Sequence, residues 1–264
     1  MGILEYSFGR YALMTVVLLA ILSGVVGTYI VVRRMVFSAG GITHASFGGI
    51  GLAYWAGFDP TLGALIFAIA TSLGINAATQ RGGVRPDSAI AMLWSLGMAI
   101  GVIFLSLSPG YAPNLMGFMF GDILAVSLRD VLCSGIAALT CVALTVVFYR
   151  PLLYSSFDGE YAKLAGWQPT LVRFVAAVMV AVAISLSIKA VGIILVLSVF
   201  SVPQAIALMY TKSLWRVMLL SGVVALIGCG AGLLLSFWFD LPSGAVITGL
   251  LTVIFIVLRL TKRG

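Results

Sequence analysis

The residue of this chain best suited to chemistry is its only histidine, His44, which lies in the stretch "GGITHASFGGIG" with five glycines around it. A neutral imidazole is a common metal ligand. An ionisable group inside an apolar segment usually faces a bundle interior or a transport path. The plainer interpretation is a hydrogen bond from His44 to a neighbouring helix. One histidine predicts no tight metal site, because zinc takes four ligands, but a transient contact in a conduit stays open.

Other reactive groups are scattered. The sequence has no second histidine, no HExxH or GxSxG motif and no Walker A loop. The chain is therefore predicted not to be an enzyme, and any ATP-driven work needs another subunit. The three cysteines have no metal-ligand spacing and are interpreted as small core residues. Several carboxylates are possible cation contacts, although each is more typical of a helix cap or a solvated loop: Asp59, Asp87, Asp122, Asp130 and Asp240.

The composition indicates which solvent surrounds these groups. Hydrophobic residues make up 62% of the 264 residues, and charged residues only 9%. A soluble domain has about 25% charged residues. The apolar runs are too long and too uniform for barrel strands and have the length of membrane helices. The sequence predicts an all-α, polytopic integral membrane bundle of eight to nine transmembrane helices, with residues 1–264 forming a single transmembrane domain.

Nine apolar segments are expected, and the second is short and rich in glycine. In that segment Gly41, Ala45, Gly49 and Ala53 recur every fourth residue, a pattern that lets a neighbouring helix approach closely. In the seventh, Pro203 predicts a kink with freed carbonyls, and Gln204 beside it serves either the kink alone or a pathway. The nine segments are 11–32, 38–57, 60–78, 88–107, 131–149, 170–188, 191–209, 215–237 and 243–259.

Basic residues predict the orientation, because cytoplasmic loops collect Lys and Arg. With the N-terminus outside and the C-terminus in the cytoplasm, only Arg10, Arg129 and Lys189 face outward. The remaining basic residues lie inside, on separate loops and the tail, so they form no groove for nucleic acid. This pattern predicts a multi-pass protein of a bacterial cytoplasmic membrane in contact with the lipid bilayer.

One long connection on the predicted inner side, residues 150–169, has the features of a short helix. Asp158 can cap its start and Gly166 can end it in a left-handed turn. Phe157, Tyr161 and Leu164 would share one face. So short a helix needs a surface to lie on. That surface is either the bundle or lipid, or a cytoplasmic partner.

Six stretches, in order and covering nearly the whole chain, resemble the membrane permease subunits of ABC importers for zinc, manganese and iron. Each is weak alone, and together they are fairly specific. They are "VVRRMVFSAGGITHASFGGIGLAY", "RPDSAIAMLWS", "FGDILAVSLRDV", "FDGEYAKLAG", "AVGIILVLSVFSVPQAIALMYTKSL" and "FDLPSGAVI".

The resemblance implies an assembly. Two permease subunits would form a homodimer on two cytoplasmic ATPase subunits, and an extracytoplasmic metal-binding protein would deliver a zinc, manganese or iron ion, with no permanently bound cofactor. About eight spanning helices are implied, so the second segment is expected to be a half-helix or re-entrant. His44 would line the path. The residues implied to couple to the ATPase are Phe157, Asp158, Gly159, Glu160, Tyr161, Ala162, Lys163, Leu164 and Gly166.

The chain departs from the family pattern beside His44. The family pairs an aspartate with this histidine one helical turn away, and here Gly40 or Gly41 takes its place; the motif's proline falls near Phe47 or Gly48. The cation is then held differently, for example by His44 with backbone carbonyls, or the substrate is a metal complex. The alternative function is a stand-alone secondary carrier driven by an ion gradient, against which the scarcity of carboxylates inside the segments argues.

Overall fold

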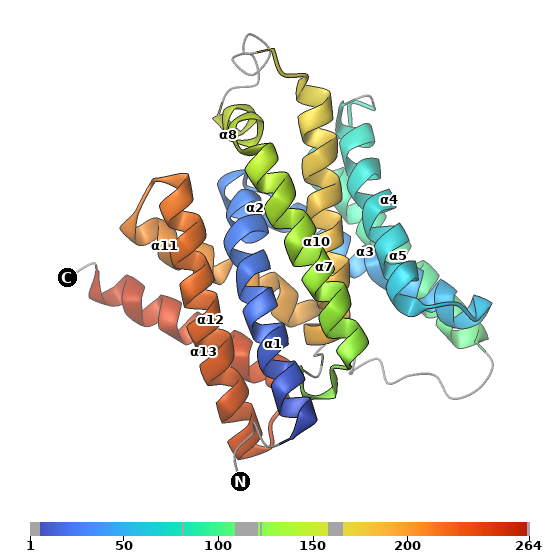
Figure 1. Cartoon of the computed structure of the whole chain (residues 1–264). Coiled ribbons are helices and arrows are strands. Elements are labelled where there is room, and N and C mark those ends of the chain that lie inside the picture. The colour runs from blue at the N-terminus through green and yellow to red at the C-terminus, as the bar shows by residue number, and fades with distance from the viewer. Residues whose placement is uncertain (1–5, 81, 109–120, 122, 158–165, 263–264) are drawn as a thin grey trace. The chain divides into compact units, whose positions relative to one another are not determined.

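The computed structural model describes residues 6–80, 82–108, 121, 123–157 and 166–262, and these form helices without any strand (Figure 1). This confirms the predicted all-α membrane protein. Eight of the described helical spans are long and apolar enough to cross a membrane. The principal elements are α1 (Ser7–Leu22), the π-helical turn η2 (Ser23–Gly27), α2 (Thr28–Val32), α3 (Val36–Ala56), α4 (Pro60–Gln80), α5 (Pro86–Leu107), the 3₁₀ turn η3 (Ile123–Ala125), α7 (Leu128–Val147), α8 (Tyr149–Phe157), α10 (Pro169–Val199), α11 (Val202–Tyr210), α12 (Leu214–Phe239) and α13 (Ser243–Thr261).

The chain divides into two compact units. Unit 1 comprises Met1–Val31, Pro113–Ala138 and Leu186–Gly264, and unit 2 comprises Val32–Ala112 and Leu139–Ser185. The boundary falls inside α7 and inside α10. Each unit is therefore built from chain segments distant in sequence.

In unit 2, α3 packs against both α4 and α5 through small residues. A Cβ added to Gly49 would collide with the carbonyl oxygen of Gly63 on α4. A Cβ on Gly48 would lie 2.7 Å from the carbonyl oxygen of Gly97 on α5, and one on Gly101 would lie 2.7 Å from that of Phe47. Backbone therefore touches backbone on two sides of α3, which confirms the close approach predicted from the small-residue row.

The second segment differs from the expected half-helix. Helix α3 is uninterrupted from Val36 to Ala56, and 13 of its 21 residues are buried. It is nevertheless not among the eight helices whose composition marks them as membrane spans. A half-length helix is therefore not found, because the glycines serve contacts with α4 and α5 and do not break the helix; the re-entrant alternative stays a prediction.

The interruption lies in the seventh segment, within unit 1. Helix α10 is kinked at Gly192, whose φ of 77° and ψ of 166° are not helical. The helix ends at Val199, and after two intervening residues α11 starts at Val202 with Pro203 in its first turn. The proline ring fits a first turn, where no helical donor is required. The predicted kink at Pro203 is thus a complete break between two helices.

Helix α8 was not predicted. Helix α7 ends at Val147, Phe148 forms a turn, and α8 begins at Tyr149. Helix α8 therefore occupies the first part of the connection expected over 150–169. Pro151 is its third residue, a position that tolerates a missing N–H. The loop expected before the short helix is therefore itself helical up to Phe157.

Candidate functional site

His44 lies midway along α3, half-buried, with its ring stacked on Trp94 of α5. The ring centroids are 4.3 Å apart and the planes are 10° from parallel. Phe37 contacts the same indole at 6.2 Å with a tilt of 55°. Stacking uses the face of the imidazole and leaves its nitrogens at the ring edge. The contact with a neighbouring helix that the plainer interpretation expected is therefore aromatic, and it orients the ring without occupying its ligand atoms.

The position of the family aspartate has little room for a side chain if it corresponds to Gly41. A Cβ built there would lie 2.5 Å from Cγ2 of Ile90 on α5. An aspartate at residue 41 would therefore require Ile90 to move. Within the described residues, no three His, Cys, Asp or Glu side chains gather into a group that could hold a metal ion.

The acidic side chains that were possible cation contacts mostly serve helix ends. The carboxylate of Asp59 accepts the N–H of Thr61 at 2.7 Å in the first turn of α4. Asp130 accepts the N–H of Ser127 at 3.1 Å and its hydroxyl at 2.6 Å before α7. Asp87 lies in the first turn of α5 without a side-chain cap bond, and Asp240 ends α12 with a φ of 51°. Asp122 lies outside the described residues.

The predicted coupling segment falls almost entirely outside the described part of the chain. Residues 158–165 are not described, Phe157 is the last residue of α8, and Gly166 is exposed with a φ of 83°. The left-handed conformation predicted for Gly166 is thus confirmed. The roles assigned to Phe157, Asp158, Gly159, Glu160, Tyr161, Ala162, Lys163 and Leu164 stay predictions.

A polar cluster in unit 1 closes the break between α10 and α11. The hydroxyl of Ser23, in the π-helical turn, donates to the carbonyl of Val199 at 2.7 Å. The Gln204 amide donates to the Ser23 carbonyl at 2.7 Å, to the Ser23 hydroxyl at 2.9 Å and to the Val199 carbonyl at 3.4 Å. Gln204 is fully buried, and its Oε1 has no hydrogen-bond partner among the described residues. The carbonyl freed by the break is therefore satisfied by side chains.

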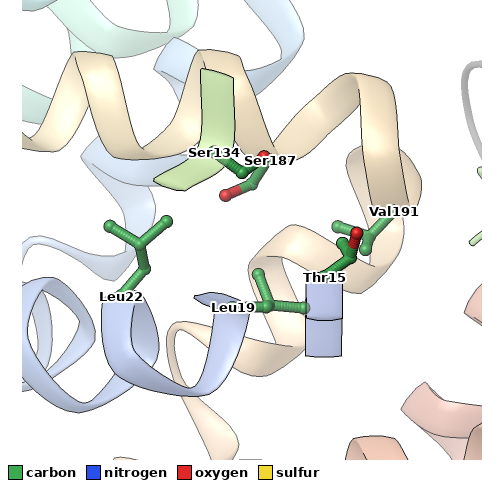
Figure 2. Close-up of a pocket in the computed structure, with 6 residues that line it drawn as sticks. All are labelled: Thr15, Leu19, Leu22, Ser134, Ser187 and Val191. Carbon is green, nitrogen blue, oxygen red and sulfur yellow. The ribbon is translucent and has the colours of Figure 1, made fainter. Parts of the chain in front are cut away.

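A second polar feature of unit 1 is a small cavity with a volume of about 10 Å³ (Figure 2). Thr15 of α1, Ser134 of α7 and Ser187 of α10 line it together with Leu19, Leu22 and Val191. Figure 2 shows the Ser134 and Ser187 side chains next to each other on one side of the cavity. The three hydroxyl-bearing residues are at most 5% exposed. A space of this size and polarity suits one water molecule.

Comparison with known proteins fits this all-helical bundle. The sequence profile described as the ABC 3 transport family matches residues 5–262. The chain belongs to this family. The family resemblance inferred from the six stretches is therefore confirmed, and the chain is a membrane component of an ABC transport system.

Related members of the family match along most of their length. The chain is 32% identical to the manganese transport system membrane protein MntC of Listeria monocytogenes, over 97% of this chain and 91% of that protein. It is 30% identical to the protein of the same name from Halalkalibacterium halodurans, over 96% of this chain and 87% of that protein. A solved structure of PsaBC from Streptococcus pneumoniae in complex with Fab superposes with a TM-score of 0.87 at 26% identity, covering 97% of this chain and 92% of that chain.

Sequence reasoning missed two partners that the fold supplies. Trp94 carried no signal beyond being an aromatic residue in an apolar run, and Ser23 none beyond being a serine. Gln204 was singled out, but its bond to Ser23 joins residues 181 apart. A glutamine directly after a proline was the only available sign that this part of unit 1 is polar inside.

Proposed function

We propose that this chain is the permease subunit of an ABC importer for a transition-metal ion, with manganese placed ahead of zinc and iron. The observation that carries the proposal is the match to the ABC 3 transport family over residues 5–262. The choice of manganese rests on two relatives that are named as manganese transport proteins and match over nearly the full chain.

The assembly follows from the family. Residues 1–264 form one permease domain from the two compact units, and two copies associate in the cytoplasmic membrane of a bacterium. A separate pair of ATPases hydrolyses ATP, since the sequence has no Walker A loop. A binding protein delivers the metal on the other side. The segment from Phe157 to Gly166 transmits the ATPase motion, and the C-terminus is cytoplasmic.

His44 contacts the ion during passage. Its ring is stacked on Trp94, and glycines lie within four or five residues of it on both sides in α3, at positions 40, 41, 48 and 49. Carbonyl oxygen suits manganese, and imidazole is a general transition-metal ligand. A contact with few ligands is weak, and transport requires release. The metal is cargo and does not reside in the protein.

Uptake measurements test the proposed function. Vesicles containing the permease with its ATPase are expected to accumulate manganese when ATP is supplied, and to take up zinc and iron less well. Uptake that requires an ion gradient, continues without the ATPase and is abolished by an ionophore would replace the proposal with the secondary carrier. If the vesicles take up zinc or iron in preference to manganese, the chain is still an importer subunit, but manganese is not its main ion.

His44→Ala tests the pathway role. We expect manganese uptake to fall about tenfold or more, which is the size of effect seen when a residue that supports a metal ligand is mutated. The protein should remain folded because the His44 side chain is only half-buried. The matched control is Ser46→Ala, since the Ser46 hydroxyl is buried and donates only to the Ile42 carbonyl of its own helix, at 2.7 Å. Equal uptake by wild type and His44→Ala would remove His44 from the path.

A further inference from the structure

A second, larger pocket lies in unit 2, where α4 ends and α10 begins. Its volume is about 150 Å³, compared with about 10 Å³ for the hydroxyl-lined cavity of unit 1. Gln80 is the last residue of α4 and Thr170 the second of α10. Because the ends of spanning helices mark the membrane surface, the pocket is at headgroup depth. The residues that define it are Leu73, Asn76, Gln80, Thr170, Arg173 and Phe174.

The polar side chains of this pocket can all donate hydrogen bonds. Nε of Arg173 is buried and has no hydrogen-bond partner among the described residues. The Asn76 amide donates one hydrogen to the Ser72 carbonyl at 2.9 Å, and its second hydrogen is available. Thr170 adds a hydroxyl and Gln80 an exposed amide. No acidic residue is among the described residues that line the pocket.

A pocket with one fixed positive charge and several donors selects an anion with several acceptor oxygens. Arginine binds phosphate through two parallel N–H donors. A buried, unpaired guanidinium nitrogen costs free energy that such a ligand would recover. Phosphate therefore fits the pocket better than a neutral or cationic group.

The apolar residues around the pocket indicate the source of the phosphate. Phe174 in the pocket wall is 51% exposed, and Leu171 one turn before residue 174 is 49% exposed. In a membrane protein such side chains face lipid chains, so a ligand held here extends from a polar group into an apolar region. Basic pockets between membrane helices on the cytoplasmic side bind acidic lipid headgroups. The predicted orientation places this end of α4 on that side.

We propose that the pocket at Arg173 binds the phosphate of an anionic phospholipid, with its glycerol and chains against Phe174 and Leu171. Neither the transport activity nor the family assigns a ligand to this position. The site is separate from His44 and is independent of which ion is carried.

Lipid binding to the full-length permease in detergent tests the proposal. Native mass spectrometry and thermal unfolding are recorded with phosphatidylglycerol, with phosphatidylcholine and with inorganic phosphate. We expect phosphatidylglycerol to bind and to raise the unfolding midpoint. In Arg173→Gln its affinity should fall about tenfold, on the scale of one charge-assisted hydrogen bond. The phosphatidylglycerol affinity of Arg173→Lys should lie between that of the wild type and that of Arg173→Gln.

The matched control is Arg216→Gln. Arg216 is the third residue of α12, is exposed and lines neither pocket, so its loss removes the same charge near a helix start. It should leave phosphatidylglycerol binding unchanged. Thr170→Ala supplies a second, milder variant if Arg173→Gln does not fold, and its affinity should drop about threefold, on the scale of one neutral hydrogen bond.

Three results would overturn the proposal. One is equal phosphatidylglycerol binding by wild type and both pocket variants. Another is a response to inorganic phosphate as large as that to the lipid, which would make the pocket a free-anion site. The third is lost ATPase binding in Arg173→Gln with lipid binding intact, which would assign the arginine to a protein partner.

Discussion

Two regions of the molecule, one in each unit, bring helices together in different ways. In unit 2, α3 meets α4 and α5 through glycines, with backbone against backbone at Gly49 and Gly63 and at Gly48 and Gly97. In unit 1, the π-helical turn η2 meets the α10–α11 break through side-chain hydrogen bonds of Ser23 and Gln204. Lipid gives no hydrophobic drive for helix association, so contacts must come from close packing or from polar groups. The contacts of α3 use the first solution and the helix break uses the second, although each unit also contains the other kind of contact: Gly24 closely approaches the Met218 carbonyl in unit 1, and the Ser72 hydroxyl donates to the Ala177 carbonyl in unit 2.

The difference shows what each region can tolerate. The glycines of α3 allow close packing while the helix stays uninterrupted from Val36 to Ala56, where the imidazole of His44 is presented. Polar packing permits a broken helix, because the freed Val199 carbonyl finds donors in Ser23 and Gln204. A π-helical turn next to a helix break is a common feature of functional regions, and here the two are joined by hydrogen bonds.

Gly49→Ala should have the largest effect, because the new Cβ would collide with the Gly63 backbone, which cannot move aside as a side chain can. Overpacking of this kind costs about 1–3 kcal/mol, and a backbone obstacle places the expected loss at the upper end. The matched control is Gly230→Ala on α12, where a Cβ meets nothing within 4 Å. Thermal unfolding in detergent should show a lower midpoint for Gly49→Ala and an unchanged or higher midpoint for the control. Equal midpoints would show that α3 and α4 can separate without cost.

Gln204→Met should have an intermediate effect. The substitution keeps the length of the side chain and removes the amide that donates to Ser23, while the Val199 carbonyl keeps the Ser23 hydroxyl. Loss of a partner for a buried carbonyl costs about 1–3 kcal/mol, so we expect about 2 kcal/mol less stability in the same unfolding assay. Gln168→Met, at an exposed glutamine before α10, is the control. A Gln204→Met protein as stable as this control would mean that the break does not need the amide.

Features formed by neighbours in sequence could be predicted from the sequence alone, whereas contacts between distant segments could not. The small-residue row in α3 and the proline at residue 203 are local patterns: the close approach at the first was predicted, and the second was predicted as a kink where the structure has a complete break. Asp59 and Asp130 were correctly favoured as cap residues because capping involves neighbours in sequence. The partners of Gln204 and the stacking of His44 on Trp94 join distant segments, and no local pattern specifies them. Helix α8 was missed because a short run with Pro151 near its start is equally typical of a loop.

Ser134→Ala should have the smallest effect, and it tests whether the hydroxyl-lined cavity belongs with the polar packing of unit 1. Ser134 is 5% exposed and has no hydrogen-bond partner among the described residues. If its hydroxyl contacts only a water molecule, alanine should change stability by less than about 0.5 kcal/mol. Ser221→Ala is the matched buried comparison, because Ser221 donates to the Val217 carbonyl at 2.7 Å and lies 3.2 Å from the Thr28 hydroxyl. That variant should lose about 1 kcal/mol. A larger loss for Ser134→Ala than for Ser221→Ala would mean that the cavity hydroxyls hold α1, α7 and α10 together, and the polar packing of unit 1 would then extend from the helix break to Thr15.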